Sequence, residues 1–259
     1  MIAKKIGVTF GGGAAKGVAH IGVIKCFQEN GIDFDIVTGN NAGSIAGAMY
    51  AYGYTWRNML KFVQTATKRK SIWFKYGFLY NSASIESIVE KAIGNVHFSD
   101  LPKPFCCVAC NLRTGKLVVL NSGKVAKAVR ASCSIPGIYK PTPIGDMLLV
   151  DGCIINSIPS NICRNMGADY VVTVDLNSDR RKGTTSDSFV EYLLTSFYIM
   201  VGSNAVTGLA NSDLVISPNL TGFNYHKLER IEELVELGEK AAYEKLPQIK
   251  EAVRRLKEQ

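Results

Sequence analysis

The sequence lacks long hydrophobic runs. No stretch approaches the roughly 18 consecutive apolar residues that mark a candidate membrane-spanning helix. The apolar residues ahead of the glycine cluster at Gly11 are too few for the core of a signal peptide, so we expect no secretory leader. These absences argue against an integral membrane protein. They predict a cytoplasmic one, with peripheral contact to the inner face of the membrane left open.

The chain also lacks a convincing set of metal ligands. Its seven cysteines are odd in number and lie mostly in apolar runs, which fits free buried thiols in a reducing compartment. Cys107 and Cys110 have C-x-x-C spacing, but they lie in a predicted strand, and no second Cys or His pair has ligand spacing. We therefore expect no metal and no redox centre.

Nucleotide-binding signatures are absent as well. The glycines after the first apolar run could suggest a dinucleotide fingerprint. However, G-x-G-x-x-G starting at Gly11 would need a glycine at Lys16, and starting at Gly12 it fails at Ala14. The Gly-Lys-Ser/Thr ending of a P-loop is missing too. No organic cofactor is indicated.

Acidic residues are fewer than basic ones, 22 against 30, so the formal net charge is +8. This excess suits an anionic membrane surface, a nucleic acid or simple solubility, and does not choose between them. The basic runs 68–70 and 180–182 could touch nucleic acid, but no DNA- or RNA-binding motif accompanies them. We expect no nucleic-acid partner, and the sequence does not indicate an oligomeric state.

What the sequence does contain is an alternation of short apolar runs and helical patterns. Strands are predicted before Gly39 and at Ile6–Phe10, Phe105–Cys110, Leu117–Leu120, Ile138–Ile144, Met147–Val150, Tyr170–Asp175 and Leu214–Ser217. Helices are predicted at 18–30, from Ala42, at Thr55–Thr67, Ser84–Ile93, Lys124–Ser132, Ser160–Asn165 and Ser188–Gly208, and over 227–257 with a break at Pro247. We therefore expect one domain over 1–259, a three-layer α/β/α fold with a largely parallel sheet.

Two segments carry apolar residues whose role is open. In 67–81, basic residues interleave with Trp73, Phe74, Tyr76 and Phe78. That pattern suits a membrane headgroup layer or a mobile lid, and equally a loop packed on the core. The predicted helix at 188–208 has a broad apolar face, for which core packing is favoured over membrane or lid contact (Phe189, Leu193, Phe197, Met200, Val201).

The chain is organised around 35–48, where an apolar run meets Gly39, turns sharply and continues as small helix-forming residues. This strand, turn and helix form the frame of a nucleophile elbow, G-x-S-x-G, with Gly39 and Gly43 in place. Asn41 occupies the position of the nucleophilic serine. Asparagine suits the strained apex, because among non-glycine residues it tolerates positive φ unusually well.

Besides a nucleophile, acyl transfer requires a base and hydrogen-bond donors for the oxyanion. Two other motifs can provide these groups. Asp151, at the end of a predicted strand, can be the base. The backbone N–H groups of Gly12, Gly13 and Ala14 open a helix after the first strand and can be the donors.

Taken together, the motifs resemble those of the patatin-like phospholipases: G-G-G-x-[RK]-G, then G-x-S-x-G, then D-G-[GA]. Here they read Gly12-Gly13-Ala14-Ala15-Lys16-Gly17, Gly39-Asn40-Asn41-Ala42-Gly43 and Asp151-Gly152-Cys153, within a resemblance covering roughly 5–220. It implies a lipid acyl hydrolase with a Ser–Asp dyad, in which position 41 is the nucleophile and Asp151 the base. The backbone of Gly12–Ala14 would form the oxyanion hole. Gly11, Lys16, Gly17, Gly39, Gly43 and Gly152 would support the motifs, and the substrate would be a phospholipid or another acyl-ester lipid.

The sequence departs from that pattern at Ala14, Asn41 and Cys153. Asn41 is decisive, because a carboxamide has no ionisable nucleophilic oxygen and forms no acyl-enzyme. Ser44 lies one turn into the helix and does not replace it. The chain is therefore predicted to be inactive as written, through a deliberate change at a serine or a natural loss; the preserved Asp151 and glycine turn favour the first.

A second hypothesis comes from another class of protein. The chain could be a non-catalytic lipid- or acyl-binding protein that keeps the pocket without the nucleophile. The two hypotheses differ in whether serine at position 41 restores hydrolysis.

Overall fold

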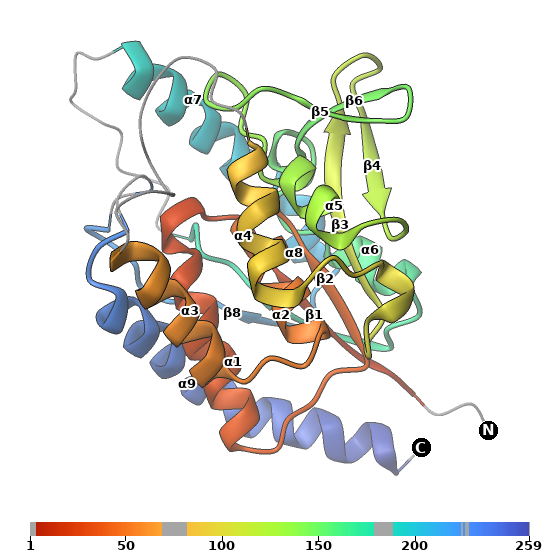
Figure 1. Cartoon of the computed structure of the whole chain (residues 1–259). Helices are drawn as coiled ribbons and strands as arrows, with labels where there is room; N and C mark the ends of the chain where they lie inside the picture. Colours follow the sequence, from red (N-terminus) through yellow and green to blue (C-terminus); the bar gives the residue numbers. More distant parts are fainter. Residues whose placement is uncertain (1–3, 69–81, 179–188, 224, 226–227, 259) are drawn as a thin grey trace.

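The computed structural model describes residues 4–68, 82–178, 189–223, 225 and 228–258 (Figure 1). The predicted lid residues Trp73, Phe74, Tyr76 and Phe78 lie outside this part of the chain, as does the basic run 180–182. Within it, no helix is both long enough and apolar enough to cross a bilayer.

The strands form one mixed, mostly parallel sheet in the order β5-β6-β3-β2-β1-β7-β8, with β4 also paired to β3. β1, β2, β3, β7 and β8 run parallel, while β4, β5 and β6 join by antiparallel pairing. The predicted α/β fold is confirmed. The strands are β1 (Ile6–Phe10), β2 (Ile36–Gly39), β3 (Phe105–Asn111), β4 (Lys116–Leu120), β5 (Thr142–Ile144), β6 (Met147–Asp151), β7 (Tyr170–Val174) and β8 (Leu214–Ile216).

Helices cover both faces of this sheet. On one face, Val8 and Phe10 of β1 belong to the main core with residues of α1 (Ala19–Glu29), α2 (Ala42–Ala51), α4 (Ala83–Ile93), α5 (Val125–Ser132) and α9 (Ile231–Lys257). On the other face, Ile36, Cys106 and Val108 pack against α6 (Ser160–Asn165). Figure 1 shows α1, α3 (Trp56–Lys68) and α9 together beside the sheet. Successive side chains of a strand point to opposite faces of the sheet. The buried central strands β1 and β2 therefore contribute apolar side chains to both helical layers.

Two predicted helix boundaries are wrong. The helix predicted to start at Ser84 starts at Ala83 as α4, and Ser82 stands at the cap position without a side-chain cap, because its hydroxyl accepts from Arg130 Nε. Pro247 does not break the last helix, since α9 continues through it to Lys257. Leu246 and Ile249, on either side of the proline, are both buried. Their packing outweighs the backbone hydrogen bond that proline cannot donate.

The helix predicted over 188–208 is divided. α7 (Phe189–Ser203) and α8 (Val206–Ala210) are separated at Asn204 and Ala205. The Asn204 side-chain amide donates to the carbonyl oxygens of Cys153 (3.4 Å) and Ile154 (2.5 Å). These bonds tie Asn204 to the turn that follows β6, at the point where α7 ends.

Candidate active site

The ends of three strands meet at the carboxyl edge of the parallel sheet. Phe10 of β1 is level with Gly39 of β2, so the glycine turn and the elbow leave the sheet side by side. Gly39 in turn is level with Cys107 of β3, and Ala109, two residues further along β3, pairs with Asp151 of β6. The antiparallel β6 therefore delivers Asp151 beside the position two residues after Gly39, which is Asn41.

The elbow is a tight, strained turn. Asn41 has φ 52° and ψ −125°, so the expected positive φ at the apex is confirmed. The turn forces α2 against the end of β1, where a Cβ on Gly43 would overlap the carbonyl oxygen of Phe10. A Cβ on Gly39 would likewise overlap the backbone of Gly43. Only glycine at these two positions permits the sharp bend that raises the side chain of residue 41 out of the sheet.

The Asn41 side chain bridges the two other motifs. Its Nδ2 donates to Asp151 Oδ2, and its Oδ1 accepts the backbone N–H of Ala14 at 3.0 Å. This orientation of the carboxamide follows from its partners, since a carboxylate only accepts and an N–H only donates. A single side chain at the elbow apex thus contacts both the residue predicted as base and one of the predicted oxyanion donors.

The backbone of Asn41 is held from the end of α5. Its N–H donates to Ser132 Oγ at 3.1 Å, and its carbonyl oxygen accepts from Ser44 Oγ at 2.6 Å and from Cys133 Sγ at 3.1 Å. Ser44 is fully buried, with its hydroxyl committed to this carbonyl. These bonds fix the strained apex and engage the Ser44 hydroxyl.

Asp151 is completely buried. Its backbone N–H donates to Ser134 O at 3.0 Å, and its Oδ1 accepts from the Cys153 N–H at 2.9 Å. Burial raises the pKa of the Asp151 carboxyl to about 6, against the opposing effect of the hydrogen bonds from Cys153 and Asn41. A carboxyl with a pKa near neutrality, oriented by its neighbours, can take and return a proton.

The glycine turn presents its amides unevenly. Gly11 N–H donates to Val174 O at 3.0 Å, and Gly12 N–H donates to Ser157 O at 3.2 Å. Among the described residues, the N–H of Gly13 has no acceptor, and that of Ala14 has only Asn41 Oδ1. The oxyanion-hole role of Gly12, Gly13 and Ala14 stays a prediction, and the geometry favours Gly13 and Ala14 over Gly12.

The other motif residues have the following surroundings in the structure. Lys16 is buried, and its Nζ lies 4.2 Å from the ring centroid of Tyr225. Gly17 has no side chain, which lets Ala42 of the elbow helix approach it closely. Gly152 lies against the backbone of Val108. The expected positions therefore come together in space, although none of these contacts by itself assigns a role.

Sequence reasoning gave no role to three residues that brace the site. Ser132 Oγ accepts from Asn41 N–H and donates to Asn40 Oδ1 at 3.0 Å. Asn177 Nδ2 donates to the Gly12 carbonyl at 2.7 Å, and Tyr225 OH donates to Asn177 Oδ1 at 3.0 Å. Polar residues that close a network across distant segments leave no local pattern, so only the fold reveals them.

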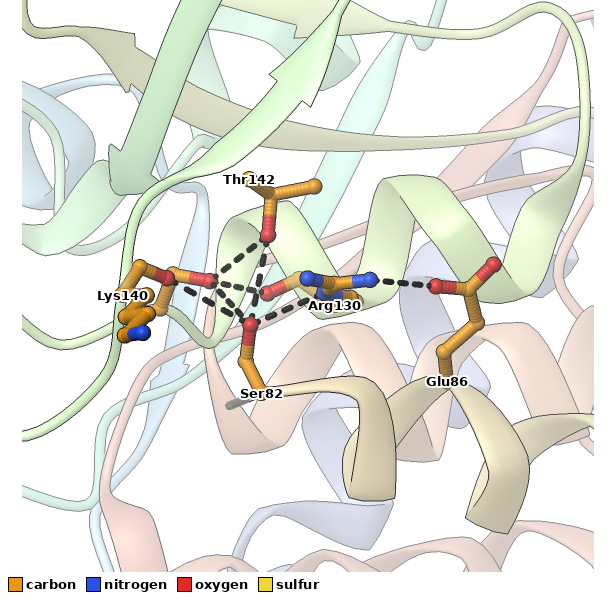
Figure 2. A network of polar contacts seen from close by, with 6 residues as sticks. Ser82, Glu86, Arg130, Lys140 and Thr142 are labelled. Carbon is orange, nitrogen blue, oxygen red and sulfur yellow. Dashed lines mark hydrogen bonds and ion pairs between the residues drawn. The ribbon is translucent and has the colours of Figure 1, made fainter. Parts of the chain in front are cut away.

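A further polar network anchors the segment that carries Ser132 and Ser134 (Figure 2). Arg130 donates through Nε to Ser82 Oγ at 2.8 Å and through Nη1 to Glu86 at 2.9 Å. Ser134 Oγ donates to the Arg130 carbonyl at 2.8 Å and lies 3.0 Å from Thr142 Oγ1. Since Ser134 O accepts the Asp151 N–H, the network connects α4 and α5 to the position of Asp151.

The histidines and cysteines form no second centre in the described ranges. His20 is buried and donates through Nε2 to the Gly11 carbonyl at 2.9 Å, and burial lowers its pKa to about 4, so it is neutral at pH 7. All seven cysteines are free and buried. Burial raises the pKa of the thiols of Cys107 and Cys110, which keeps them protonated. No group of three His, Cys, Asp or Glu residues gathers as metal ligands in this part of the chain.

Known proteins are similar to this chain in sequence over the same region. A family model described as patatin-like phospholipase matches residues 8–163, which include the glycine turn, the elbow and Asp151. Lysophospholipase NTE1 of Coccidioides immitis is 34% identical over 190 residues, or 68% of this chain and 12% of that protein. An uncharacterized NTE family protein of Mycobacterium tuberculosis is 27% identical over 268 residues, or 92% of this chain and 46% of that protein. The chain thus spans less than half the length of these relatives.

Solved structures share the fold. VipD from Legionella pneumophila superposes with a TM-score of 0.56 at 14% identity, over 95% of this chain and 67% of that one. ExoU, in its heterodimeric complex with SpcU from Pseudomonas aeruginosa, gives 0.50 at 15% identity, over 95% and 52% of the two chains. At such low identity the likeness concerns the arrangement of sheet and helices alone.

Proposed function

The chain belongs to the patatin-like phospholipase family, and from this premise we propose that its site is that of a lipid acyl hydrolase whose nucleophile position is occupied by Asn41. One observation carries the proposal: the Asn41 side chain bonds to Asp151 on one side and to the Ala14 N–H on the other. A nucleophile needs the same two neighbours, a base and an oxyanion donor. The substrate class would be carboxylic esters of lipids.

With serine at position 41, these groups complete an acyl transfer. Its hydroxyl oxygen bonds to the ester carbonyl carbon while Asp151 takes the proton, and the carbonyl oxygen becomes an oxyanion beside the N–H groups of Gly13 and Ala14. Collapse breaks the ester C–O bond, and the leaving alcohol receives the proton from Asp151. Water then attacks the acyl group with Asp151 again as base, which releases the fatty acid and regenerates the hydroxyl.

With asparagine at position 41, the first bond does not form. The lone pair of a carboxamide nitrogen is delocalised into its carbonyl group, and its N–H groups serve as donors to Asp151. We therefore propose that the chain as it stands is catalytically inactive and keeps the rest of the dyad site. Of the ester lipids, lysophospholipids are the first to test, because the relative from Coccidioides immitis is named a lysophospholipase.

A specific observation also supports the second hypothesis, a lipid- or acyl-binding protein without turnover. Asn41 provides hydrogen-bond partners for the buried Asp151 carboxylate and for the Ala14 N–H in one conformation. A site whose buried polar groups are satisfied in this way is stable without a catalytic function to maintain it.

The test compares wild type, Asn41→Ser, Asn41→Ser/Asp151→Asn and Asn41→Gly on p-nitrophenyl butyrate and lysophosphatidylcholine. We expect turnover by Asn41→Ser alone. The double variant should be slower by roughly 10²–10⁴-fold, the usual worth of a general base. Asn41→Gly is the matched control, because glycine accepts the positive φ but supplies no nucleophile.

Two results would decide against this proposal. A folded Asn41→Ser protein that hydrolyses neither ester would favour the binding protein. Turnover by the pure Asn41 protein that disappears in Asp151→Asn would overturn the proposed inactivity of the chain as it stands.

A further inference from the structure

The stretch that forms most of α7 and all of α8 carries no charge. From Tyr192 to Ser212 the sequence contains no Asp, Glu, Lys, Arg or His. A helix at the surface of a water-exposed protein ordinarily has charged residues on its outer side. A charge-free helix is therefore expected to be enclosed, either by the protein's own core or by something outside it.

The inner side of α7 is enclosed by the protein. Phe197 and Val201 are buried in a small cluster with Ile135 and Cys153. The Val201 carbonyl also accepts from Ser157 Oγ at 2.8 Å. Cys153, a member of this cluster, lies two residues after Asp151 and donates its N–H to the Asp151 carboxylate. The cluster therefore connects α7 to the candidate site.

The outer side of α7 is open, so the expected core packing is confirmed for Phe197 and Val201 and is wrong for Leu193 and Met200. Tyr192 is 52% exposed, Leu193 44%, Ile199 58%, Met200 44% and, at the start of α8, Val206 67%. Within α7 these residues are spaced at i, i+1, i+7 and i+8, which places them on one face. We call Tyr192, Leu193, Ile199, Met200 and Val206 the outer face. The other exposed large apolar side chains of the described residues are scattered over distant elements (Tyr52, Leu112, Val119, Tyr243).

We propose that the outer face docks on an anionic lipid surface. Apolar side chains with a tyrosine among them suit the boundary between headgroups and acyl chains, where charged residues would have to be desolvated. The net charge of +8 attracts the chain to such a surface. Next to α7, Ile138 and Tyr139 pack on the Phe197 cluster, and the basic residue that follows them, Lys140, is exposed.

A second copy of the chain is a poorer occupant. Stable dimers bury roughly 800 Å² on each partner. Five half-exposed side chains offer a patch of only a few hundred Å², in the range where a surface patch is often functional. A lipid surface needs no complementary partner shape, and interfacial docking requires no membrane-spanning helix.

Docking by the outer face would bring the candidate site to the lipid that contains the ester. In this respect the docking proposal rests on the proposed function. Binding itself requires no catalysis. It is measured on the wild-type chain with Asn41 in place, so that failure of one proposal does not imply failure of the other.

The experiment is co-sedimentation with vesicles of phosphatidylcholine and phosphatidylglycerol. We compare wild type, Ile199→Glu/Met200→Glu, and a control pair outside the outer face, Leu112→Glu/Tyr243→Glu. The control residues are 53% and 43% exposed, close to Ile199 and Met200, and add the same two negative charges. We expect the outer-face variant to bind at least tenfold more weakly than wild type, and more weakly than the control by a similar factor.

Three results would overturn the proposal: no binding by wild type, equal losses in both variants, or unchanged binding by the outer-face variant. A wild-type dimer in sedimentation velocity that Ile199→Glu/Met200→Glu dissolves would also overturn it, by assigning the face to a second copy. Both variants should keep the wild-type unfolding midpoint. In the Asn41→Ser background, the outer-face change should leave hydrolysis of a soluble ester unaltered and lower hydrolysis of vesicle lipid.

Discussion

At the scale of single residues, the site depends on an asparagine where a hydroxyl is expected. Asn41 keeps the strained conformation of the apex and satisfies the hydrogen-bonding groups that a nucleophile would meet. We propose that asparagine at this position removes the nucleophile and leaves the geometry of the site. Asp151 is buried beside Asn41 and accepts hydrogen bonds from the Cys153 N–H and from the Asn41 side chain.

Asp151 should make the stability of the protein depend on pH. Burial raises the pKa of the Asp151 carboxyl to about 6 in the folded chain, whereas its ordinary value, which applies to the unfolded chain, is 3.8. As pH rises from 3.8 through 6, the unfolded chain loses this proton first, so stability is lost over that window and the full loss is present above pH 6. In Asp151→Asn the side chain stays neutral, so its stability relative to wild type should increase by roughly 2.5 kcal/mol between pH 4 and pH 8.

Urea unfolding of both proteins at the two pH values measures this difference. Asp146→Asn is the control, because Asp146 is exposed in the β5–β6 turn and stays hydrated in the folded and unfolded chain. A relative stability of Asp151→Asn that stays constant or falls with pH would contradict the burial of an ionisable carboxyl at this position.

Ala14 is a second strained residue. Its φ of 47° lies in the left-handed region, which costs an alanine roughly 1–2 kcal/mol. Ala14→Gly should therefore raise the free energy of unfolding by up to about 1 kcal/mol once the backbone entropy of glycine is included. Ala15→Gly, at the next position and without positive φ, should lower it by roughly 0.5–1 kcal/mol. Denaturant unfolding of both variants checks the opposite signs, and equal losses would count against the strain.

At the scale of elements, α4 and α5 act as a support for the site. The network of Ser82, Arg130 and Ser134 holds the segment whose Ser134 carbonyl accepts the Asp151 N–H (Figure 2). The Ser82 hydroxyl bonds to Arg130 in this network and not to the first turn of α4, so α4 begins without a side-chain cap.

Ser82→Ala should destabilise the protein by about 1–3 kcal/mol, because it removes a buried acceptor from the Arg130 guanidinium. Ser99→Ala, at an exposed serine, should change stability by less than about 0.5 kcal/mol. Thermal or urea unfolding tests the contrast. In the Asn41→Ser background, Ser82→Ala should also slow ester hydrolysis, and no effect on either property would remove the network from the account.

At the scale of the whole molecule, the sequence predicts the fold class and the three motifs well, because strand ends and glycines leave strong local signals. The elbow strand and helix were predicted and are present, as are the two strands that became β5 and β6, although β5 begins at Thr142 and not at Ile138. The sequence could not show that β6 runs antiparallel beside β3 and so brings Asp151 level with Asn41, since strand pairing is not a local property. Tertiary packing also decided against the break at Pro247, and it left one face of α7 exposed.

The most direct test of the central claim, that position 41 is a nucleophile position served by Asp151, is covalent trapping. An alkyl fluorophosphonate transfers its phosphonyl group to an activated serine oxygen with loss of fluoride. Intact-mass analysis with peptide mapping should show one adduct, at position 41, in Asn41→Ser and none in wild type. In Asn41→Ser/Asp151→Asn it should form at least tenfold more slowly. An adduct at another residue, or a folded Asn41→Ser protein that stays unlabelled, would contradict the account.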